Sequence, residues 1–196
     1  MSHSGSGGGT VAKGGGDWQI GLGADVAWIT NSTETGLSIT SAIPPIFDAY
    51  ATIVMPEPGV PALLAEHELR VLRLLMAETA DQDWWLGYLD TGTDDVVFPD
   101  APRVLLYAHW GYVVVKAGPA QAQLWRTAGS TPRHTRLPDL MFPEDRTWLL
   151  SALWDDDWWC LGGSARLVDA FLADPGLKAH RVGTDDDATP PGHVSY

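Results

Sequence analysis

The residues best suited to chemistry in this sequence are Asp90, Thr91 and Gly92, which directly follow the apolar stretch "WWLGYL" at 84–89. Two aspartates that share one proton can hydrolyse a peptide bond, because one carboxylate activates water while the other polarises the carbonyl group. The chain contains a single Asp-Thr-Gly, so such a pair would have to form between two copies. Asp, Thr and Gly are also favoured turn residues. The same tripeptide could therefore join two strands without any catalytic role.

The segment "LDTGTDDVV" at 89–97 resembles the catalytic loop of retroviral-type aspartic proteases, in which the motif lies between apolar strands. The resemblance implies that Asp90 is the catalytic carboxylate, that Thr91 fixes the loop by a hydrogen bond, and that Gly92 lets the backbone approach closely. The segment "CLGGSARLV" at 160–168 resembles, in outline, a later part of the same family. Together they imply a homodimeric peptidase.

A second group of candidate residues combines acidic and aromatic side chains. The run Asp155, Asp156 and Asp157 is followed by Trp158, and Trp84 begins a similar Trp-Trp pair. Neighbouring residues of a strand point to opposite faces, so one Trp of each pair can be buried while the other is exposed. An exposed Trp amid Asp residues suits an interface or a cationic ligand. The alternative is that the Trp residues build the core and the Asp run is a solvated turn.

The overall charge limits the classes of partner. The chain has 196 residues, with 25 acidic and 12 basic side chains and a formal net charge of -13. Such a chain repels nucleic acid and anionic membrane surfaces, and no apolar run reaches the roughly 20 residues of a membrane span. We therefore expect a basic protein as partner, with no nucleic acid and no membrane. Three consecutive carboxylates seldom converge on one ion, and we expect neither a metal nor a cofactor.

Cysteine usage favours a cytoplasmic protein, and the acidic, aromatic character of the chain favours a binding protein over an enzyme. Cys160 is the only cysteine, so an intramolecular disulfide is impossible and a reducing cytoplasm fits. An acidic chain of this size has the general character of the bacterial immunity proteins that neutralise basic toxins, or of a regulator. The alternative function is the aspartic peptidase.

The composition divides the chain into three parts. Residues 1–16 are rich in Gly and Ser, and we expect a flexible leader. Residues 17–183 form a single domain, and 184–196 form an acidic, disordered tail.

The elements expected in the domain indicate an α+β fold, a small antiparallel sheet of short strands packed with three to four helices. Apolar periodicity predicts a helix over 61–80, with Ala65, Leu69, Leu72 and Met76 on its packed face and Glu66, Arg70 and Arg73 on another. Further helices are expected at 118–129, 143–156 and 165–174. Strands are expected at 24–30, 51–55, 84–89, 95–98, 103–110, 111–118, 158–163 and 177–182.

Overall fold

The computed structural model of the chain describes residues 18–57, 60–79, 81–92, 98–126, 135–153 and 156–194. In this part of the chain, nine strands form one sheet, and every neighbouring pair is antiparallel. The strands are β1 (Trp18–Ile20), β2 (Ala49–Val54), β3 (Trp84–Leu89), β4 (Val104–Leu106), β5 (Trp110–Ala117), β6 (Leu140–Pro143), β7 (Leu149–Ser151), β8 (Trp158–Gly163) and β9 (Lys178–Val182). The helices are α1 (Gly23–Thr30), α2 (Pro61–Thr79) and α3 (Ala165–Ala173), with short 3-10 turns η1 (Ile39–Ser41) and η2 (Pro119–Gln123).

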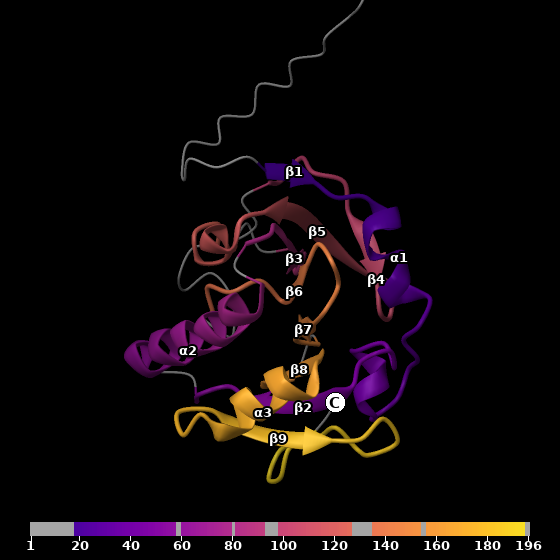
Figure 1. The fold of residues 1–196 in the computed structure, drawn as a ribbon. Helices are drawn as coiled ribbons and strands as arrows, with labels where there is room; N and C mark the ends of the chain where they lie inside the picture. The colour runs from indigo at the N-terminus through magenta and orange to yellow at the C-terminus, as the bar shows by residue number, and fades with distance from the viewer. Residues whose placement is uncertain are drawn as a thin grey trace, which may run out of the picture.

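The sheet follows the order β1-β5-β3-β6-β7-β8-β2-β9, and β4 also lies beside β5. β1 pairs with the end of β5 (Trp18↔Ala117) and β4 with its beginning (Leu106↔Trp110), so β1 and β4 share one edge of the sheet. β9 forms the opposite edge. In Figure 1 the sheet therefore runs from β1 at the top to β9 at the bottom.

Each face of the sheet carries its own core. Side chains alternate between faces, which places Trp84 and Trp159 in the core beneath α2 and α3, and Trp85 and Trp158 in the core beneath α1 and η1. Figure 1 shows these helices on opposite sides of the sheet. All four indoles are at most 9% exposed. Of the two alternatives that the sequence left open for these Trp residues, the structure shows the core and not an exposed ring, because both faces are covered.

The predicted α+β class is also wrong, because the described chain is mostly one large sheet with only three α-helices. The largest difference lies at 143–156, where we expected a helix. There Pro143 ends β6, the Asp145 carboxylate accepts the backbone N–H of Thr147 at 3.1 Å to hold a turn, and β7 follows. β7 bridges β6 and β8. Its pairing with two neighbours outweighs the local preference of the Pro-Glu-Asp start for a helix.

The segment at 24–30 shows the reverse difference, because it forms α1 rather than a strand. Asp25 lies in the first turn of α1, where its carboxylate accepts the backbone N–H of Leu22 at 2.8 Å. A carboxylate at this position satisfies a free N–H and suits the helix dipole. The helix predicted at 118–129 is, in its described part, only the turn η2.

Helix α2 has the predicted bounds within one residue, but the packed face was misassigned. Its buried side chains include His67, Val71 and Leu75, whereas Leu69 is 58% and Met76 39% exposed. The strands at 84–89 and 158–163 are confirmed, as is the helix at 165–174 to within one residue. Part of the strand predicted at 95–98 lies outside the described residues.

The structure describes most of the C-terminal segment but not the N-terminal one. The leader predicted at 1–16 lies outside the described residues. Of the segment 184–196, for which we expected a disordered tail, residues 184–194 are described and contact the domain. Asp187 forms an isolated antiparallel β-bridge with Ser38, and the backbone N–H of Ala188 donates to the carbonyl of Leu37 at 2.8 Å. In the described chain no helix combines the length and apolar character needed to cross a membrane.

Candidate functional site

Asp90 lies directly after β3, in a turn that its own carboxylate stabilises. One oxygen of this carboxylate accepts the backbone N–H of Gly92 at 3.0 Å, and the other accepts Nε of Arg103 at 2.6 Å. Gly92 has φ +78°, a conformation that glycine adopts without strain. The Asp90 side chain is about a third exposed, and five of the residues that follow, 93–97, lie outside the described residues.

The charge on Asp90 is fixed by these partners. The Arg103 guanidinium and the N–H of Gly92 hold the pKa of the Asp90 carboxyl below its usual value. A catalytic pair of aspartates shares a proton, which requires that one carboxyl keep it in the working pH range. An arginine in contact with Asp90 opposes that state. The geometry is that of a turn held by an ion pair to Arg103, which directly precedes β4.

The Trp residues proposed for binding lie inside the molecule. Trp84 is fully buried, where its indole N–H donates to the carbonyl of Thr79 at 3.1 Å and its ring packs edge-on against Trp148 at 4.8 Å. Trp158 is 3% exposed in the opposite core, with the ring of His193 at 6.1 Å. Neither indole presents its ring to a partner in this arrangement.

The Asp run before β8 is only partly described. Asp155 lies outside the described residues, and Asp156 is half-buried and engaged. Asp157 is exposed and pairs with His193, whose Nδ1 lies 2.8 Å from one carboxylate oxygen. The structure thus brings Asp157 and Trp158 near the C-terminal segment and places Trp84 elsewhere in the sheet. Within the described ranges, no group of three His, Cys, Asp or Glu side chains is arranged to hold a metal ion.

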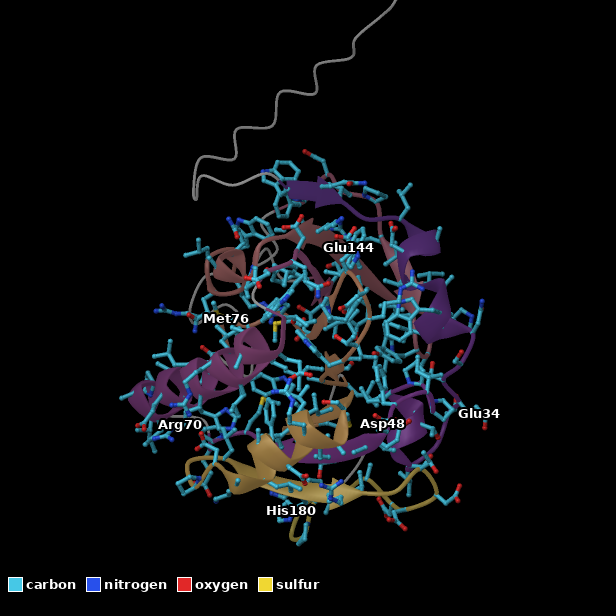
Figure 2. The ribbon with its side chains drawn as sticks, viewed as in Figure 1. Glu34, Asp48, Arg70, Met76, Glu144 and His180 are labelled. Atoms are coloured by element: carbon cyan, nitrogen blue, oxygen red, sulfur yellow. The ribbon has the colours of Figure 1, made fainter. Side chains whose placement is uncertain are left out.

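Exposed carboxylates gather instead where the loop after β9 meets the segments on either side of η1. The pairing of β9 with β2 ends at Tyr50↔Val182, so the loop after β9 starts beside the segment that precedes β2 and contains Asp48. The bridge between Ser38 and Asp187 then brings the loop against the segment before η1. Figure 2 shows Glu34 and Asp48 on the side of the molecule where this loop lies.

We call this region the acidic loop surface, and it consists of Glu34, Leu37, Ile46, Asp48, Asp185, Asp186 and Asp187, all of which are exposed. Leu37 and Ile46 are its apolar members, at 59% and 61% exposure. Its five carboxylates form no ion pair with any other described residue.

Backbone and side-chain hydrogen bonds fix the loop of this surface. The Asp186 carboxylate accepts the backbone N–H of Gly183 at 2.8 Å, and that of Asp187 accepts the backbone N–H of Thr189 at 2.9 Å. The contacts from Thr189 lower the pKa of Asp187 below its usual value, so this carboxylate stays charged at neutral pH. These bonds hold the carboxylates of Asp186 and Asp187 in place within the loop.

Part of this surface was visible in the sequence and part was not. The run Asp185 to Asp187 is evident, but we interpreted it as a disordered tail. Nothing in the sequence links it to Leu37 or Ile46, about 140 positions earlier, because the β-bridge at Ser38 and the pairing of β9 with β2 make those connections. No protein-family model matches the chain, and comparison with curated proteins and with solved structures found no match.

Proposed function

We propose that this chain is a non-enzymatic binding protein that engages a basic partner protein through the acidic loop surface. The observation that carries the proposal is that five exposed carboxylates, none of which forms an ion pair with a described residue, belong to the same surface region as two exposed aliphatic side chains. The net charge of -13 supports a positively charged partner. An immunity-like or regulator-like role fits such a partner.

Charge and apolar contact have different parts in this proposal. Unpaired carboxylates attract a basic protein over roughly 8 Å at physiological salt, which raises the rate of encounter. Leu37 and Ile46 then supply apolar surface that a partner can cover, and this burial slows dissociation. The loop is already held by the β-bridge to Ser38 and by its own hydrogen bonds. Binding therefore costs little conformational entropy in the loop.

The first experiment compares two variants of equal charge. In the test variant, Asp185, Asp186 and Asp187 become Asn, whose amide oxygen can still accept the loop hydrogen bonds. In the control, Asp81, Asp83 and Asp100 become Asn, because these are also exposed. Each variant and the wild type are used to capture partners from an extract of the producing cells at two salt concentrations.

We expect wild type and control to retain the same basic protein, more weakly at high salt, and the test variant to lose it. Ile46→Ser should weaken capture without changing the salt dependence. Equal loss in test and control variants would mean that only net charge matters, and an acidic or neutral partner would contradict the proposal.

The peptidase alternative gains no support from the contacts of Asp90. It is tested by the cleavage of unfolded protein between pH 4 and 7, with wild type and Asp90→Asn compared. We expect no cleavage by either. Cleavage by the wild type alone would make Asp90 catalytic and would overturn the non-enzymatic proposal.

A further inference from the structure

Helix α2 carries a second apolar stripe beside the face that it buries in the core. Along this stripe, four-three-four spacing relates Ala65, Leu69, Leu72 and Met76, and this is the spacing at which two helices pack along a seam. Ala65 is exposed, and Leu69 and Met76 are 58% and 39% exposed, whereas Leu72 is 7% exposed. Three of the four residues of a helix-packing seam thus lie on the surface of the described chain.

A hollow of about 350 Å³ lies beside the stripe, between α2 and η2. Its α2 wall consists of four residues, namely Leu69, Leu72, Arg73 and Met76, and its η2 wall consists of Pro119, Ala120 and Gln123. Where two helices pack along a seam, a side chain of one helix enters a hole formed by four residues of the other. The stripe therefore offers both parts of such a contact, because Leu69 projects from it and Leu72 lines a hollow that can receive a side chain.

The stripe is complementary to a copy of itself that runs in the opposite direction. In an antiparallel pair of α2 helices with the two-fold axis between Arg70 and Val71, Leu69 lies opposite Leu72 of the second copy. Ala65 then lies opposite Met76, so a small side chain faces a long one. A two-fold contact repeats each of these pairs, and all four residues of the stripe are used twice.

The charges beside the stripe are complementary in the same arrangement. Glu66 and Arg73 each directly follow a residue of the stripe, and their side chains are 60% and 66% exposed. In the antiparallel pair, Glu66 of each copy lies near Arg73 of the other, which gives two symmetric contacts of opposite charge. Within the chain Glu66 pairs with Arg70 and Arg73 with Asp174, and both side chains keep most of their surface free for a further contact.

We infer that this chain forms a symmetric homodimer through antiparallel contact of two α2 helices, with Leu69 of each copy in the hollow beside Leu72 of the other. Figure 2 shows Met76 on the side of the molecule away from Glu34 and Asp48, so the acidic loop surface lies outside this contact. The net charge of -13 opposes self-association. The dimer is therefore measured at physiological salt, which screens charges more than about 8 Å apart.

The first test is analytical ultracentrifugation of the full chain from micromolar to millimolar concentration. Wild type should dimerise, and Leu69→Lys should raise the dimer dissociation constant at least about tenfold, because it replaces two buried leucines with charges. The control Leu105→Lys changes a leucine of similar exposure, 55%, on β4, and it should dimerise as wild type does. A wild type that stays monomeric at millimolar concentration, or equal behaviour of the two variants, would overturn the proposal.

Charge reversal tests the antiparallel register. Glu66→Arg brings two pairs of arginines together across the contact and Arg73→Glu two pairs of glutamates, so each variant alone should dimerise about tenfold more weakly. A one-to-one mixture of the two variants restores both contacts of opposite charge and should dimerise as well as wild type. Mixing cannot restore the pairs with Arg70 or Asp174, which lie within one chain. A mixture that associates no better than its components would overturn the proposal.

Discussion

The buried histidine of α2, His67, makes the stability of the protein depend on pH between about 6.5 and 4. Burial lowers the pKa of His67 from its ordinary 6.5 to about 4, with a smaller effect of the same sign from Arg70. The unfolded chain therefore takes up a proton between these two values that the folded chain excludes. Stability is complete above the ordinary pKa and is lost as the pH falls through the window.

The size of the effect follows from the shift. One pKa unit corresponds to about 1.4 kcal/mol, so the full loss is roughly 3 kcal/mol, of which about 2 kcal/mol falls between pH 7 and pH 5. The carboxyls of Asp90, Asp174 and Asp187 have pKa values held below the usual 3.8, and they contribute mainly at lower pH. Of these four shifted groups, His67 is therefore the one that acts above pH 5.

The assay is urea unfolding followed by tryptophan fluorescence at pH 7 and pH 5. Wild type should lose about 2 kcal/mol more than His67→Phe on acidification, because phenylalanine keeps the ring against Trp159 but cannot bind a proton. His180→Gln, on β9, serves as the control and should follow the wild type. Parallel losses in wild type and His67→Phe would refute the reasoning, since they would show that His67 does not titrate differently in the two states.

Three further predictions concern stability and use the same assay. Gly162→Ala should cost about 1–3 kcal/mol of stability, because its Cβ would lie 2.5 Å from side-chain atoms of Ile43 and Phe47. The control Gly23→Ala, in open space at the start of α1, should change stability little. Equal effects of the two substitutions would contradict this. Asp139→Ala should cost about 3–5 kcal/mol, since it leaves the Arg126 guanidinium, now 2.5 Å from the carboxylate, buried without its counter-charge. A loss below about 1 kcal/mol would mean that water replaces the carboxylate. Glu68→Ala should cost at least about 1–3 kcal/mol, because the Thr135 hydroxyl and the backbone N–H of Arg136 both donate to this buried carboxylate; an unchanged midpoint would show that these donors find other acceptors.

Some elements could be predicted because the signals that specify them are local. The strands at 84–89 and 158–163 are runs of apolar and aromatic residues bounded by polar turns, and both form as predicted. Helix α3 is capped by Ser164, whose hydroxyl accepts the backbone N–H of Leu167 at 3.1 Å, and its apolar stripe faces the core. In these cases propensity, capping and burial favour the same structure.

Other elements were mispredicted because distant residues decide them. β7 is a strand since β6 and β8 pair with it on both sides, although its own start is typical of a helix. The packed face of α2 carries Val71 and Leu75, which join the core, and Glu68, which accepts hydrogen bonds from residues almost seventy positions later. Either face of α2 carries enough apolar side chains to be buried, so periodicity alone could not choose between them.

The sequence by itself determined the charge of this protein, its single unpaired cysteine and the residue types that its strands bury. Only the tertiary structure decided which acidic residues lie together. Asp185 to Asp187 are adjacent in the chain, but Asp48 joins them through the pairing of β9 with β2, and Leu37 joins them through the bridge at Ser38. The physical reason is that a β-sheet satisfies its backbone hydrogen bonds between segments remote in sequence, and no local pattern records which segments those are.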